Sequence, residues 1–152
     1  ETAREGIVRI GARAVNPLLE TLERSELRVH RYICWALGDM GPAARPALPQ
    51  LMRIAGDRET YTPASGSALD GGTESTPNCA VVALSKLVQR GDDAVIPLFL
   101  ECELWPNEAG IRGLTKIGAR TDAVRDALQA AVRAPDRDVR IAAREALAQL
   151  GM

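Results

Sequence analysis

Residues 138–151 have the sequence DVRIAAREALAQLG, and this stretch decides the fold. Its apolar residues recur at intervals of three and four, which places them along one broad stripe of an α-helix. That stripe comprises Val139, Ala142, Ala143, Ala146, Leu147 and Leu150. Asp138 stands where a side chain can cap the start of this helix, and Gly151 is the residue type that commonly follows a helix end. We therefore predict a helix over 139–150.

A second helix precedes this one and completes a hairpin. Thr121 and Asp122 offer N-caps for a helix over 123–133, and Pro135 with Asp136 ends that helix. This pair is the clearest copy of a unit that recurs along the chain.

The recurrence is marked by glycine. Each of five glycines follows an apolar run at helical spacing: Gly11, Gly41, Gly91, Gly118 and Gly151. Their separations are 30, 50, 27 and 33 residues. Without a Ser/Thr/Gly-rich insertion of roughly 20 residues in the long interval, all four separations approach about 30, the period of stacked helical hairpins.

Working back from each glycine gives the same helix pair. The predicted helices cover 2–10, 14–24, 27–40, 43–55, 77–90, 93–104, 106–117, 123–133 and 139–150. We predict an all-α, right-handed α-solenoid of about four hairpins preceded by an orphan helix. The range 1–152 forms one repeat array with an inserted loop at 56–76. Because the chain starts at Glu1 with an incomplete unit, we expect a fragment of a longer array.

Two segments carry a family resemblance. Residues 36–44, ALGDMGPAA, and 139–147, VRIAAREAL, resemble the HEAT repeat and, more narrowly, its short bacterial form, the phycobilisome-lyase HEAT-like repeat. In that family a Val-Arg pair opens the second helix and an Ala-Leu-Gly-x-Ile-Gly run closes it. The last unit keeps this pair as Val139-Arg140, whereas Val29-His30 and Pro106-Asn107 depart from it. The resemblance covers nearly the whole chain except 56–76, and it implies a binding scaffold rather than a particular activity.

Aligning the second helices on their closing residues defines the candidate site. One set of equivalent positions holds Glu5, Trp35, Arg112 and Glu145, and another holds Arg9, Asp39, Lys116 and Gln149. These positions lie off the apolar stripe, so we expect them on the concave surface that second helices line in this family. Because Trp and Arg are enriched at binding hot spots, Trp35 is the central candidate. The predicted binding residues are Arg9, Trp35, Asp39, Arg112, Lys116 and Glu145. Alternatively, Trp35 packs under the insertion or covers a neighbouring helix.

The insertion, GDRETYTPASGSALDGGTEST over 56–76, is the strangest segment. Loops this long inside a compact array are usually functional or disordered, and its Gly-Ser and Gly-Gly pairs favour flexibility. Tyr61 and Leu69 are its candidate contact residues. Both a mobile loop of minor function and a partner-contacting loop remain open.

Composition excludes several other classes of protein. A net charge of −1 and a pI of about 5.9 argue against bulk attraction to nucleic acid or anionic lipid, and no apolar run is long enough for a membrane span. Cys34, Cys79 and Cys102 lack motif spacing, so we expect buried thiols and no metal site. A single histidine, His30, cannot build the paired His-Glu iron site of deoxyhypusine hydroxylase. We expect a surface or hydrogen-bonding role for it, and no cofactor.

The sequence therefore predicts a non-catalytic protein–protein interaction or assembly scaffold, located in the cytoplasm, whose uncapped ends favour self-association. A protein partner is expected and a membrane partner is not; nucleic-acid binding by shape is a further, less favoured alternative. The main alternative is an enzyme or enzyme subunit. The subfamily name suggests a bilin lyase, and Trp35 with Asp39 one turn later resembles helical-repeat DNA glycosylases of the alkylpurine type.

Three basic residues of the last predicted helix and its start form a ridge, namely Arg137, Arg140 and Arg144. We interpret this ridge as a solvated face or, alternatively, as a weak phosphate contact.

Overall fold

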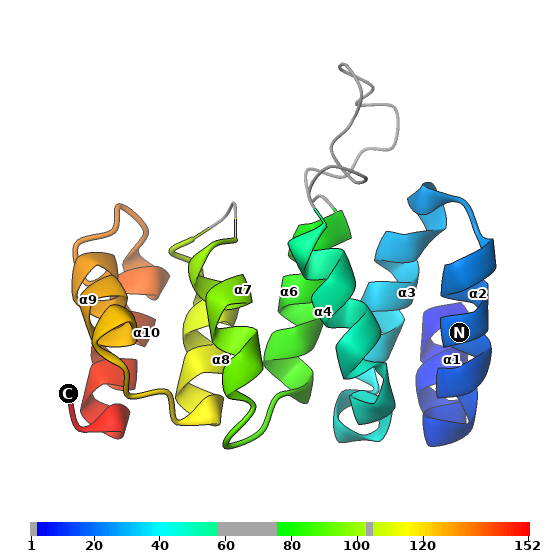
Figure 1. The fold of residues 1–152 in the computed structure, drawn as a ribbon, viewed down its shortest axis with the longest axis horizontal. Helices are drawn as coiled ribbons and strands as arrows, with labels where there is room; N and C mark the ends of the chain where they lie inside the picture. Colours follow the sequence, from blue (N-terminus) through cyan, green and yellow to red (C-terminus); the bar gives the residue numbers. More distant parts are fainter. Residues whose placement is uncertain (1–2, 58–75, 103–104) are drawn as a thin grey trace, which may run out of the picture. The chain divides into compact units, whose positions relative to one another are not determined.

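The computed structural model describes residues 3–57, 76–102 and 105–152 (Figure 1). These residues are helical and include no β-strand, which confirms the all-α class. They fall into two compact units, Glu1–Leu87 and Val88–Met152. Tyr61 and Leu69, the candidate contacts of the insertion, lie outside the described residues.

The first unit is organised around one buried helix. Its elements are α1 (Ala3–Ile10), η1 (Gly11–Ala14), α2 (Val15–Arg24), α3 (Leu27–Asp39), η2 (Gly41–Ala47), α4 (Leu48–Gly56) and α6 (Thr76–Leu87). Helix α6 packs extensively against both α3 and α4 (Figure 1). Leu37, Leu51, Ile54 and Leu84 are wholly buried where these helices meet. The fit of α3 on α6 is close at Gly38, where an added Cβ atom would lie 3.0 Å from the Cα of Ala83 and would press the two helices slightly apart.

The second unit is a set of shorter helices. Its elements are η3 (Asp93–Val95), α7 (Ile96–Leu100), α8 (Glu108–Ile117), α9 (Asp122–Ala131) and α10 (Arg137–Leu150). Helix α10 packs on both α8 and α9, and α7 packs on α8. The buried Phe99 ring lies directly over Gly113, where an added Cβ would come within 2.4 Å of it. A side chain at position 113 would therefore force α7 away from α8.

The glycine series is confirmed, because all five glycines have positive φ angles. Gly118 and Gly151 show what this conformation achieves. Beyond them, the amide of Ala119 donates to the carbonyl of Leu114 over 3.2 Å, and the amide of Met152 donates to that of Leu147 over 3.0 Å. These bonds are typical of the Schellman motif, which satisfies the last helical carbonyls only when the chain turns left-handed.

The predicted helices are present, but some begin or end elsewhere. The helix predicted over 43–55 is a 3₁₀ segment followed by α4, since Pro46 and Pro49 cannot donate the amide hydrogen bonds of a continuous α-helix. The helix predicted over 93–104 is η3 followed by α7, which ends at Leu100. Helix α8 begins at Glu108 rather than 106, because the Asn107 side chain accepts from the amide of Gly110 over 2.8 Å.

The capping residue of α10 was predicted wrongly. Asp136 rather than Asp138 is the N-cap, and its Oδ1 accepts from the amides of Asp138 over 2.8 Å and Val139 over 3.0 Å. These two hydrogen bonds lower the pKa of Asp136 below the ordinary range of a carboxyl group, because they stabilise its charged form. The prediction for Thr121 is confirmed, since its hydroxyl accepts from the amide of Val124.

Two of the cysteines, Cys34 and Cys79, belong to the first unit together with His30, and Cys102 belongs to the second. Cys34 and Cys79 are buried as predicted, whereas Cys102 is half-buried and its Sγ accepts from Asn107 Nδ2 over 3.1 Å. All of them are free thiols. His30 is only 6% exposed, so a surface position was wrong. Its Nε2 lies 3.2 Å from the carbonyl oxygen of Ser25, so the expected hydrogen-bonding role is confirmed.

Candidate binding groove

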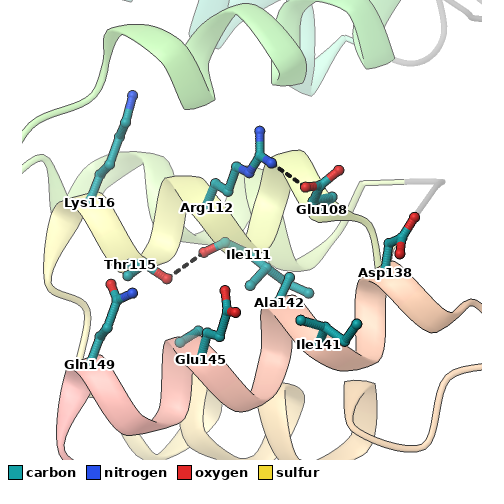
Figure 2. A pocket seen from close by; sticks show the side chains of 11 residues that line it. Glu108, Ile111, Arg112, Thr115, Lys116, Asp138, Ile141, Ala142, Glu145 and Gln149 are labelled. Carbon is teal, nitrogen blue, oxygen red and sulfur yellow. Dashed lines mark hydrogen bonds and ion pairs between the residues drawn. The ribbon is translucent and has the colours of Figure 1, made fainter.

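The second unit contains an open groove between α8 and α10. In Figure 2, Glu108 and Asp138 lie at one end of the groove, and Lys116 and Gln149 lie at the other, so the two helices run parallel. The groove has a volume of about 490 Å³. Its lining residues are Glu108, Ile111, Arg112, Thr115, Lys116, Asp138, Ile141, Ala142, Glu145, Ala146 and Gln149.

Apolar side chains form the floor of this groove. Ile111 is buried beneath it, Ala142 is half-buried, and Ile141 leaves 40% of its surface exposed. A branched apolar side chain that is this exposed gains free energy when a ligand covers it. The floor can therefore contribute hydrophobic contact to a bound partner.

The rims of the groove are polar and carry both signs of charge. On the α8 rim, Arg112 forms an ion pair with Glu108 one turn earlier, as drawn in Figure 2. The Thr115 hydroxyl donates to the carbonyl of Ile111 over 2.8 Å. On the α10 rim, Asp138 and Glu145 are exposed, and neither forms an ion pair with another residue that the structure describes.

Part of the predicted site lines this groove. Arg112, Lys116 and Glu145 line it; in Figure 2 the Glu145 side chain points from α10 toward α8, whereas the side chains of Arg112 and Lys116 extend away from α10. Ile141 was not among the predicted residues. A signal was present, because Ile141 is a large apolar residue that lies off the buried stripe of its own helix.

The remaining predicted residues lie in the first unit. Arg9 is exposed on α1, and Trp35 is half-buried on α3. Asp39 Oδ1 lies 2.7 Å from Lys86 Nζ, an ion pair that joins α3 to α6. This carboxylate therefore already takes part in a contact between two helices.

Trp35 has an aromatic neighbour that the sequence analysis did not single out. The ring of Tyr32 meets the ring of Trp35 edge to face, with centroids 5.5 Å apart and an interplanar angle of 82°. Tyr32 is 52% exposed, and the Arg31 guanidinium lies 4.8 Å from its ring centroid. A spacing of three residues to Trp35 on a predicted helix is the signal that could have found Tyr32.

Arg140 does not belong to a solvated basic ridge. Its Nη1 donates to the carbonyl oxygens of Ala134 over 2.8 Å and Pro135 over 2.6 Å. It thereby ties the start of α10 to the turn after α9. Arg137 and Arg144 are exposed, as a solvated face requires.

Within 3–57, 76–102 and 105–152, no group of three or more His, Cys, Asp or Glu side chains is placed to hold a metal ion. In the same ranges, no helix has the length and apolar character needed to cross a bilayer. Comparison of the chain with protein-family models, curated proteins and solved structures finds no match. The HEAT-like resemblance therefore stays a prediction.

Proposed function

We propose that this chain is a non-catalytic protein-binding module of the HEAT-like α-solenoid class, and that the groove between α8 and α10 binds its partner. In this proposal α8 and α10 are the second helices of consecutive repeats, and the groove belongs to the concave surface. The observation that carries the proposal is Ile141, a 40% exposed apolar side chain with charged residues on both rims around it.

That arrangement supports protein binding on physical grounds. Protein interfaces combine an apolar centre, which loses water on binding, with a polar rim that sets orientation and specificity. Ile111, Ile141 and Ala142 supply such a centre, and Arg112 and Glu145 belong to the rim. The Tyr32 and Trp35 pair on α3 offers a second exposed aromatic contact for the same partner or another.

The catalytic alternatives have weaker support. A glycosylase needs a carboxylate available to its substrate, whereas the Asp39 carboxylate is paired with Lys86. The lyase hypothesis depends on the subfamily resemblance alone. A shift in bilin absorbance on mixing with the chain would favour it over the scaffold hypothesis.

The test is affinity capture from a lysate of the source organism, followed by quantitative mass spectrometry. Three forms are compared: the natural chain, Ile141→Asp in the groove, and Ile10→Asp as a matched control. Ile10 is an exposed isoleucine too, at 58%, but it lies on α1 in the first unit. We expect a discrete protein to bind the natural chain and the control, and to be lost with Ile141→Asp.

Circular dichroism must show equal helix content in all three forms. If both substitutions leave the captured proteins unchanged, the groove is not the binding surface and the proposal is wrong.

A further inference from the structure

The α10 rim has a regular chemical pattern along the groove. Asp138, Ile141, Ala142 and Glu145 occupy positions i, i+3, i+4 and i+7, so they share one face of α10. An apolar centre is therefore flanked by a carboxylate on each side. With a rise of 1.5 Å per residue, these carboxylates stand on backbone positions about 10 Å apart along the helix axis.

The negative charge of this rim is not compensated within the described residues. Asp138 and Glu145 form no ion pair there. The arginines of α10 do not line the groove, and Arg140 donates instead to backbone carbonyls. The cations that line the groove both stand on α8: Arg112 is paired with Glu108 on its own helix, and Lys116 lies at the opposite end of the groove from Asp138. A partner that brings cations to the α10 rim thus gains attraction without breaking an existing pair on that rim.

We infer that the groove accepts a basic amphipathic α-helix of a partner protein. One face of that helix carries apolar residues that pack on Ile141 and Ala142, with a Lys or Arg on either side, two turns apart, facing Asp138 and Glu145. This inference rests on the proposed function and names the chemistry of the partner.

Shape and length favour a helix over an extended peptide. Two parallel helices form a furrow into which the side-chain ridge of a third helix packs. From Asp138 to Gln149 the groove spans about 16 Å, which is the length of three helical turns. A peptide that binds by adding a strand would need a sheet edge for its backbone hydrogen bonds, and the described residues contain no strand.

The experiment is a selection from a displayed library of amphipathic helical peptides, each about 15 residues long so that a helix can form. The positions of one face are randomised, and the intact chain is the bait. We expect the selected peptides to carry Lys or Arg seven residues apart, with an apolar residue between them. Selection of acidic or uncharged faces, or no enrichment at all, would overturn the inference.

A selected peptide is then measured by fluorescence anisotropy against three forms of the chain. The double variant Asp138→Asn with Glu145→Gln should weaken binding about tenfold or more and reduce its dependence on salt. Arg144→Gln, an exposed change on the same helix outside the groove, should leave affinity unchanged or raise it slightly. Equal binding by the natural chain and the double variant would also overturn the inference.

Failure of this inference is distinguishable from failure of the proposed function. If lysate capture depends on Ile141 but the selected peptides lack paired basic residues, the groove binds a protein of different chemistry. If capture does not depend on Ile141, the proposed function itself is wrong.

Discussion

Different interactions stabilise the helices of the two units. In the second unit, α8, α9 and α10 start with a side chain that accepts from helical amides, whereas α7 does not. In the first unit, α2, α3 and α4 start without any side-chain cap hydrogen bond. There α3 and α4 pack extensively against α6. Side-chain caps therefore recur at the helix starts of the second unit, whereas α3 and α4 of the first unit are stabilised by burial against α6.

The largest expected effect tests the dependence of the first unit on α6. Leu84→Ala removes a wholly buried side chain from α6 and leaves a cavity. We expect the free energy of unfolding to fall by about 2–5 kcal/mol, measured by urea denaturation. Val82→Ala on the same helix is the control, because Val82 is only half-buried and should cost less. Equal losses for the two variants would contradict a core centred on Leu84.

A smaller effect is expected in the second unit at the contact of α7 with α8. Gly113→Ala places a Cβ within 2.4 Å of the Phe99 ring, so we expect overpacking to cost about 2 kcal/mol. Phe99→Leu in the same chain should reduce this penalty, and a double-mutant cycle measures the coupling. Gly6→Ala is the matched control, since nothing lies within 4 Å of its added Cβ. A penalty that is unchanged by Phe99→Leu would show that the ring is not its cause.

The smallest effect concerns the cap of α10 and its pH dependence. Hydrogen bonds from the amides of Val139 and Asp138 lower the pKa of Asp136 in the folded chain. Its stabilising contribution is therefore complete above the ordinary carboxyl pKa of about 4, and it is lost as pH falls through the lower folded pKa. Asp136→Asn keeps an amide-accepting cap but does not titrate. Unfolding measured between pH 7 and 2 should therefore depend less on pH in this variant than in the natural chain.

Asp138→Asn is the control for this measurement, because Asp138 does not cap the helix. If Asp136→Asn and the natural chain lose stability identically on acidification, the Asp136 cap does not contribute to acid unfolding.

The difference between local caps and long-range packing also explains which features of the fold could be predicted from the sequence. Helix ends marked by Gly118, Gly151 and Thr121 were predicted correctly, because each depends on residues within a few positions. The choice of Asp136 over Asp138 was missed, because both are good caps and an apolar stripe fixes the face of a helix rather than its first residue. The late start of α4 was missed because apolar periodicity does not distinguish a 3₁₀ segment from the first turn of an α-helix.

The candidate site was predicted in part for a related reason. Repeat alignment named Arg112, Lys116 and Glu145, and all three line the groove from α8 and α10. It did not identify Ile141, whose signal was a large apolar side chain off the buried stripe of its own helix rather than a matching position in another unit. The aromatic contact of Tyr32 with Trp35 was within reach of the sequence, because both lie on one helix.

The buried thiols of the first unit give the chain a built-in chemical reporter. Burial, with a smaller contribution from nearby Cys79, raises the pKa of Cys34 to about 12, so at neutral pH the side chain is a shielded, unreactive thiol. A maleimide added to the native protein can therefore modify Cys34 only during the moments when α3 separates from its neighbours. The rate of that modification follows the opening of the first unit, and no cysteine has to be introduced to measure it.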